Sequence, residues 1–174
     1  MNTLHPQRGF TIVETLVAIT ILMIAIAGPL SIASKGLTAA VTSRDQMVAT
    51  YLAQESLEVV KNVRDNNVLT GASWINNMSS CTGGNKCDAD YLDSSIKTGL
   101  STYPLKVTSS NTYSHDSSGT ATGFSRYFFL SQSGGSTSCL STDAQCLVTV
   151  SVSWNEGIVP YQVLLSTEIL NASR

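Results

Sequence analysis

The sequence predicts an α+β protein in which one long N-terminal helix packs on a small antiparallel sheet. Three observations support this class. Glu14 is the only charged residue between Phe10 and Ser34, and an apolar run of about 20 residues is long enough to cross a bilayer. A mixed polar and apolar stretch continues to Arg64. Near the C-terminus, residues 147–154 alternate between apolar and polar side chains, which is typical of a strand with one buried face.

The apolar run near the N-terminus differs from two simpler segments. It is longer than the 7–15-residue apolar core of a secretory signal peptide, and no clear Ala-x-Ala cleavage site follows it. A plain membrane anchor fits the length but leaves Glu14 unexplained, because a carboxylate inside a bilayer is costly. Thr11-x-x-Glu14 also matches a capping box, in which the glutamate reaches back to the N-cap amide.

The N-terminal motif Arg8-Gly9-Phe10-Thr11-Ile12-Val13-Glu14, with the apolar run behind it, resembles the start of type IV prepilins and type II secretion pseudopilins. The resemblance covers about the first 37 residues. It implies a leader that ends at Gly9, cleavage there by a membrane aspartic peptidase, and N-methylation of Phe10 as the first mature residue. Glu14 falls on the family's glutamate position, the fifth mature residue. The implied organisation is a leader (1–9), a transmembrane and filament-core segment (10–37) and an extracytoplasmic pilin-like head (38–174).

The resemblance implies a structural subunit, a minor pilin or pseudopilin, of a type IV pilus-like filament. The ammonium on Phe10 of one subunit is expected to pair with Glu14 of a neighbour. Because Phe10 and Glu14 are four residues apart, an intrachain pair is the alternative. Expected partners are other pilin subunits, the prepilin peptidase and methyltransferase, the inner-membrane assembly platform and the cytoplasmic membrane. The head is expected outside the membrane before assembly and in a cell-surface filament afterwards.

Two other functions remain open at this point. One is a filament-tip binding module for a surface, DNA or secreted cargo, and the other is a membrane-anchored extracellular domain that never polymerises. The run Ala49–Glu58 resembles the equivalent part of minor pilins. The sequence does not distinguish a major from a minor subunit. Nor does it distinguish an adhesive or motile pilus from a DNA-uptake filament or a secretion pseudopilus. The formal net charge is −2 and no basic cluster occurs, so nucleic-acid binding is not indicated.

The helix is predicted from Phe10 to Arg64. Gly28-Pro29 predicts either a proline kink or local unwinding. Beyond Lys35, apolar residues recur at spacings of seven and four and predict a helix face that packs on the sheet. The helix is expected to end with cations in its last turn and a left-handed stop at Asn66-Asn67. The apolar stripe comprises Val41, Val48, Leu52, Val59 and Val63, and the cations are Lys61 and Arg64.

The middle of the chain, from Val68 to about Ser125, is rich in Ser, Thr, Gly and Asn and predicts loops with one or two short elements, such as Tyr103–Val107. Four cysteines, Cys81, Cys87, Cys139 and Cys146, favour disulfides in a head outside the cytoplasm, with local pairing as the simplest of three connectivities. Their spacing does not resemble a zinc site. Asp88, Asp90 and Asp93 are expected to form a solvated acidic loop. Calcium binding is the alternative, although the loop lacks the features of an EF-hand.

The C-terminal region predicts three antiparallel strands. Val148, Val150, Val152 and Trp154 are expected on one face of the first. A turn begins at Asn155, with a connection to Pro160 that is longer than a minimal hairpin. The partner strand is expected over Tyr161–Leu170, with Val163, Leu165 and Ile169 on one face, and the third over Tyr127–Ser131.

No catalytic constellation occurs in the sequence. His5 would leave with the leader, and His115, in a Ser-rich segment, is expected to be solvated. Neither a Gly-x-Ser-x-Gly elbow nor a phosphate-binding loop is present. We therefore expect no enzyme activity, no cofactor and no metal.

Overall fold

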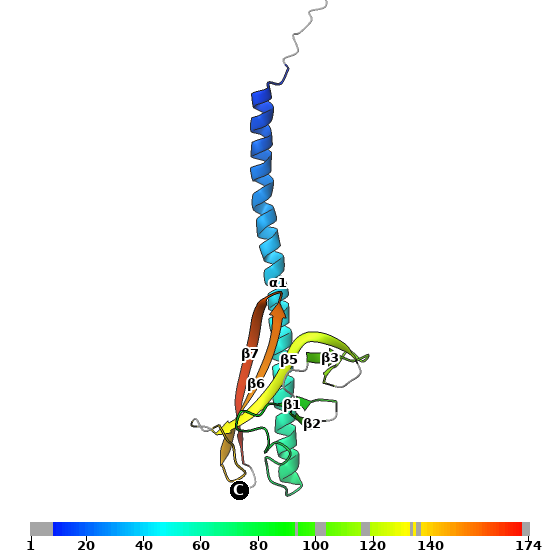
Figure 1. Ribbon diagram of the computed structural model, residues 1–174, viewed down its shortest axis with the longest axis vertical. Coiled ribbons are helices and arrows are strands. Elements are labelled where there is room, and N and C mark those ends of the chain that lie inside the picture. The colour runs from blue at the N-terminus through cyan, green and yellow to red at the C-terminus, as the bar shows by residue number, and fades with distance from the viewer. Residues whose placement is uncertain are drawn as a thin grey trace, which may run out of the picture. The chain divides into compact units, whose positions relative to one another are not determined.

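A computed structural model describes residues 9–92, 94–99, 104–115, 119–132, 134 and 137–171 of the protein. The chain divides into two compact units, Met1–Arg44 and Asp45–Arg174. Within the described residues one long helix precedes seven strands, and the predicted α+β class is confirmed (Figure 1). The elements are α1 (Ile12–Leu69), β1 (Cys87–Asp90), β2 (Ser95–Thr98), β3 (Pro104–Val107), β4 (Tyr113–Ser114), β5 (Thr120–Gln132), β6 (Gln145–Glu156) and β7 (Val159–Leu170).

Helix α1 begins with a side-chain cap at Thr11. The backbone amide of Glu14 donates to Thr11 Oγ1 at 3.2 Å, which satisfies one of the amides that have no partner inside the helix. This is one half of the predicted capping box. The helix continues through Pro29, so the local unwinding that we considered there is not observed.

The predicted end of α1 near Arg64 is wrong, because the helix continues to Leu69. Gly71 adopts a left-handed conformation with φ of 73°. The amide of Ala72 donates to the carbonyl of Asn67 at 2.9 Å, and the amide of Gly71 to that of Val68 at 3.1 Å. This is a Schellman motif, in which glycine ends the helix at little steric cost.

Asn67, which we predicted as part of the stop, is instead a buried residue of the helix. Its side-chain amide donates to the carbonyls of Trp74 and Asn76, at 3.3 and 2.7 Å. The asparagine therefore fastens the segment after the helix rather than ending the helix. Because α1 extends to Leu69, Lys61 and Arg64 lie before its last turn, which contains no basic residue.

Strand β5 is the centre of an antiparallel sheet. One edge of β5 pairs with β6, which pairs in turn with β7. The other edge pairs with β3 along its first half and with β1 at Phe128, and β4 and β2 follow outward from these. Figure 1 shows β5, β6 and β7 as the long strands.

The middle region contains more regular structure than we predicted. Four short strands, β1 to β4, replace the one or two expected elements, and β5 begins at Thr120 rather than Tyr127. The short strands depend on pairing with β5 or with each other. Because strands of two to four residues show no reliable alternation, local sequence did not reveal them.

The core of the second unit lies between α1 and the sheet, as predicted. Val148, Val150 and Val152 of β6 are fully buried, and Trp154 nearly so. The predicted face of β7 is also confirmed, with Ile169 buried and Val163 and Leu165 packed against the core. On α1, Leu52 and Val59 are buried, and Val48 and Val63 pack against the core. Val41 is 45% exposed, so the predicted stripe is wrong at this one position.

The connection between β6 and β7 is a minimal hairpin, which corrects the longer connection that we predicted. Glu156 pairs with Val159 across a turn of Gly157 and Ile158, and Gly157 has φ of 62°. Pro160 is part of β7, opposite Asn155. Proline is tolerated there because, in the described part of the chain, β7 is an edge strand.

Candidate functional site

The N-terminal motif lies at the exposed start of α1. Gly9 and Phe10 precede the helix, and the Phe10 side chain is 79% exposed. Glu14 is the acidic residue of the first helical turn and is also exposed. The proposed processing bond after Gly9 therefore lies outside regular structure, while Glu14 is held on the helix.

The first unit presents an uncovered apolar helix surface. From Ile12 to Leu37, large apolar side chains such as Leu16, Ile24 and Ile32 are exposed. By length and composition, α1 is able to cross a membrane. An apolar surface of this size needs either lipid or other apolar helices around it, because its exposure to water is costly.

Both cysteine pairs form local disulfides. Cys81 is bonded to Cys87 and Cys139 to Cys146, with Cα atoms 5.6 and 5.9 Å apart. All four cysteines are buried. The first bridge joins the segment after α1 to the start of β1, and the second closes the loop before β6.

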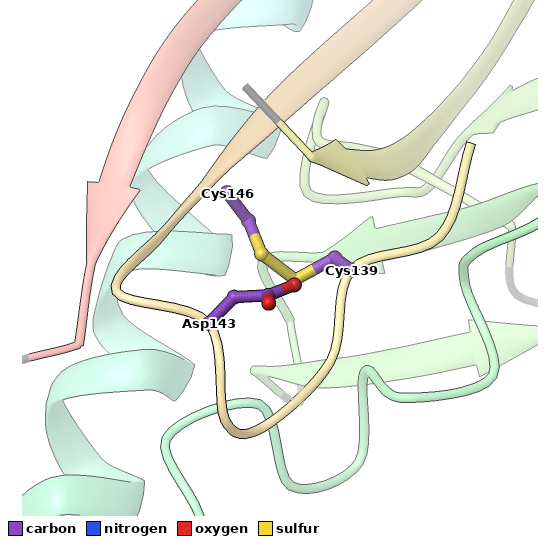
Figure 2. A group of neighbouring side chains, drawn as sticks. All are labelled: Cys139, Asp143 and Cys146. Carbon is purple, nitrogen blue, oxygen red and sulfur yellow. A yellow bond between two sulfur atoms is a disulfide. The ribbon is translucent and has the colours of Figure 1, made fainter. Parts of the chain in front are cut away.

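Figure 2 shows Asp143 beside the Cys139–Cys146 disulfide. These residues offer three potential metal-ligand atoms within 4.8 Å of one another. A cysteine binds metal as a thiolate, however, and both sulfur atoms are bonded to each other here. The carboxylate of Asp143 accepts a hydrogen bond from the amide of Leu140 at 2.9 Å. The group therefore shapes a loop and is not a metal centre.

The predicted solvated acidic loop is wrong for two of its three residues. Asp88 and Asp90 lie in β1, with 0% and 1% exposure, and Asp93 lies outside the described residues. Burying a carboxylate is costly unless cations and hydrogen-bond donors satisfy it. Both residues have such partners, from elements far apart in the sequence.

Asp88 pairs with Arg126, which is buried in the middle of β5. Arg126 Nε donates to Asp88 Oδ1 at 2.9 Å, and Arg126 Nη1 donates to Glu55 Oε1 at 3.0 Å. Two carbonyls also accept from this guanidinium, Leu52 O at 3.2 Å and Ala89 O at 2.8 Å. Burial acts to lower the pKa of Arg126, but the charges of Asp88 and Glu55 outweigh it and raise the pKa above its ordinary value. The guanidinium thus stays charged and joins α1, β1 and β5.

Asp90 has its own set of donors. Ser114 Oγ donates to its carboxylate at 2.6 Å, Lys97 Nζ at 3.0 Å, and the amide of Leu92 at 3.1 Å. Burial acts to raise the pKa of Asp90, but these hydrogen bonds together lower it below its ordinary value. Asp90 therefore ties β1 to β2 and β4.

His115 is not solvated, which corrects our expectation. Its side chain is 2% exposed and its Nδ1 contacts Asp88 Oδ2. His115 directly follows β4. Because β4 pairs with β3, His115 lies inside the head. We name the group of Glu55, Asp88, Asp90, Lys97, Arg126 and His115 the buried charge cluster.

One signal in the sequence could have revealed this cluster. Arg126 occupies a core-facing position of β5, between Phe124 and Phe128, which are both buried. A charged residue at an inward position of an alternating strand requires a buried partner of opposite charge. The sequence does not show which acid that partner is.

The long helix with an apolar first part, followed by a head in which the helix packs on an antiparallel sheet, is a pilin-like layout. Residues 4–28 match the family model described as the prokaryotic N-terminal methylation motif, which is the type IV prepilin and pseudopilin signal. The chain thus carries the signal of a pilin-like precursor that prepilin peptidase processes, and this signal points to a structural subunit rather than an enzyme. Comparison with curated proteins gave no match, and comparison with solved structures gave none either.

Proposed function

We propose that this protein is a minor pilin or pseudopilin that assembles into a type IV pilus-like filament through its N-terminal helix. The single observation that carries the proposal is Glu14, an isolated carboxylate on an exposed apolar helix four residues after Phe10. In a plain anchor the acid would serve only the first turn of the helix, where the amide of Glu14 donates to Thr11 Oγ1. In the filament, by contrast, it has a definite partner.

Cleavage after Gly9 leaves a new ammonium on Phe10, and methylation of an amine need not remove its charge. In a bundle of apolar helices, the Glu14 carboxylate of one subunit then pairs with the Phe10 ammonium of its neighbour. Electrostatic attraction is strong in a low-dielectric setting, and an unpaired charge there is strongly disfavoured. The pair therefore selects one axial register between neighbouring helices.

The exposed apolar surface of the first unit supports two successive environments. Before assembly it lies in the cytoplasmic membrane with the head outside, and after assembly it lies among the helices of other subunits. Both environments remove the same side chains from water. Assembly therefore transfers the helix from the lipid to the apolar helices of other subunits.

The isosteric variant Glu14→Gln tests this function in cells with an active prepilin peptidase. We expect leader removal and membrane insertion to remain intact, and incorporation into filaments to be lost or strongly reduced. Mass spectrometry of the mature N-terminus and recovery of the protein in sheared filaments provide the two readouts. Glu58→Gln, which changes an exposed carboxylate of the head, is the matched control. Normal incorporation of Glu14→Gln would refute the assembly role, and a mature protein that retains Met1–Gly9 would favour a plain anchor.

A further inference from the structure

Strand β7 is a long edge strand that no other described strand covers. It pairs with β6 along all twelve of its residues, and within the described parts of the chain nothing pairs with its other edge. The opposite side of the sheet ends in β2 and β4, which have four and two residues. Natural sheets protect their edges with very short strands, charges, prolines or bulges. One side of this sheet follows that rule, whereas β7 is long and has only Pro160 and Glu168 as such features.

The exposed edge has few features that discourage pairing. From Tyr161 to Thr167, β7 has no charged residue, no proline and no glycine, and its register with β6 is regular throughout. Pro160 and Glu168 lie on either side of this segment. An uncharged segment of high β-propensity at a free edge is a template for a further strand.

The core is also incompletely covered at this edge. Val150 and Val152 of β6 are fully buried, whereas their partners on β7, Leu165 and Val163, are only partly buried. On the opposite face, Leu164 is 60% exposed. A strand added beside β7 with apolar side chains at the same alternation would cover Val163 and Leu165.

The sequence of β7 indicates what this strand is, because it is nearly symmetric in chemical character about Leu164. Val163 and Leu165 flank the centre, followed by the polar pair Gln162 and Ser166. The next positions outward are Tyr161 and Thr167, then Pro160 and Glu168, then Val159 and Ile169. A strand with this symmetry is complementary to itself in antiparallel orientation.

We propose that β7 pairs antiparallel with β7 of a second copy of this chain, about a two-fold axis at Leu164. In this register Val163 lies opposite Leu165 of the second copy, and Gln162 lies opposite Ser166. Glu168 lies opposite Pro160 of the second copy, so no like charges face each other. Cross-strand pairs of this kind stabilise sheets, and a two-fold contact uses the same surface on both copies.

The backbone supports this register. Because Glu156 pairs with Val159 across a two-residue turn, Val159 and the other odd-numbered residues of β7 direct their backbone groups toward β6. The even-numbered residues direct theirs to the free edge. The nitrogen of Pro160, which carries no hydrogen, therefore faces the free edge. The proline leaves the pairing with β6 intact and removes one hydrogen bond at each end of the proposed contact. Leu164 has its amide and carbonyl available to Leu164 of the second copy.

The two-fold axis fixes the relative direction of the two copies of the second unit. A half-turn about an axis normal to the sheet reverses every strand of the second copy, together with the part of α1 that packs on its sheet. The two sheets therefore lie antiparallel in the dimer.

Cysteine cross-linking of the full-length protein in detergent tests the register. Leu164→Cys places two sulfur-bearing residues directly opposite each other, with Cα atoms about 5.5 Å apart, within the range for a disulfide. We expect mild oxidation to give covalent dimers. Ser166→Cys, on the same face of the strand, is the matched control, because its two copies are about 14 Å apart in this register. A mixture of Ser166→Cys and Gln162→Cys is expected to cross-link. Equal cross-linking of Leu164→Cys and Ser166→Cys, or none with either, would overturn the proposal.

Sedimentation of the unoxidised protein tests the association itself. Leu164→Lys places two ammonium groups opposite each other at the axis and is expected to weaken dimerisation at least about tenfold. Ser166→Lys, which keeps the two ammonium groups apart, is expected to have a smaller effect. A Glu14→Gln background keeps this result separate from helix assembly, because β7 pairing does not depend on Glu14. If the protein is monomeric at all concentrations, or if Leu164→Lys associates normally, then the proposal is wrong.

Discussion

Arg126 Nε donates to Asp88 Oδ1 at 2.9 Å, and both side chains are 0% exposed. A buried ion pair of this kind adds little stability compared with well-packed apolar residues, but breaking it leaves an uncompensated charge in the core. The pair therefore makes the head intolerant of single changes at these two positions.

Arg126→Met is expected to destabilise the head by about 3–5 kcal/mol, because Asp88 would stay buried without its cation. Urea unfolding of the full chain in detergent, followed by the fluorescence of Trp74 and Trp154, measures this change. Lys61→Met is the control, since its pair with Glu58 is exposed and is expected to contribute less than about 1 kcal/mol.

The double variant Asp88→Asn with Arg126→Met should recover part of the lost stability, because both charges are removed together. If the double variant were as unstable as the sum of the two single variants, the two residues would not act as a pair.

Acid is expected to weaken the head through Asp90. Its pKa in the folded protein lies below the ordinary value of 3.8, so the unfolded chain takes up the proton first as the pH falls. The contribution of Asp90 to stability is therefore complete above about pH 5 and is lost as the pH falls below 4 toward the folded pKa.

The measurement is the midpoint of urea unfolding between pH 3 and 7 for the wild type and for Asp90→Asn. The variant should be less stable at pH 7 and should lose less stability on acidification. Asp65→Asn, which removes an exposed partner of Arg64, should leave the slope almost unchanged. Parallel pH profiles for wild type and Asp90→Asn would contradict this account of Asp90.

Removal of either disulfide is expected to cost roughly 2–2.5 kcal/mol in the chain-entropy model, because each closes a short loop. For a chain of this size this corresponds to a fall in Tm of about 4–10 °C. The paired substitutions Cys81→Ser with Cys87→Ser, and Cys139→Ser with Cys146→Ser, test the two bridges separately by thermal unfolding. Intact-mass measurement of the unreduced protein should find no free thiol. Four free thiols would contradict both bridges.

Gly71→Ala is expected to destabilise the end of α1 by about 1 kcal/mol. Its φ of 73° is accessible to glycine without strain, and no atom outside its neighbours lies within 4 Å of an added Cβ, so the cost comes from the backbone alone. Gly36→Ala, within the helix and equally free of contacts, should instead leave stability unchanged or raise it. Unfolding midpoints of the two variants compare these effects, and equal behaviour would argue against the cap.

Regular periodicity explains which parts of the fold were predictable. The inward valines of β6 and the buried positions of α1 follow periods of two and 3.6, which the sequence displays directly. The N-terminal motif was readable for a similar reason, because its order and spacing lie within one short segment. These features require no knowledge of distant contacts.

The buried charge cluster was not predictable in the same way. Asp88 and Asp90 look like a polar loop until the strands pair. Strand β5 then brings Arg126 beside Asp88, 38 residues away in sequence, and Asp90 meets Lys97 and Ser114. His115 depends in the same manner on the pairing of β4. The turn after Asn155 was predicted, but its short length and the end of α1 were not, since each depends on one glycine with positive φ.

Arg126 also donates to the carbonyl of Leu52, and so one guanidinium fastens the helix to two strands. Tension applied along α1 would reach the head as shear between helix and sheet. Shear must break these buried bonds together with the apolar contacts around them, whereas peeling would break them one after another. The cluster therefore suits a subunit whose helix is pulled while its head stays folded.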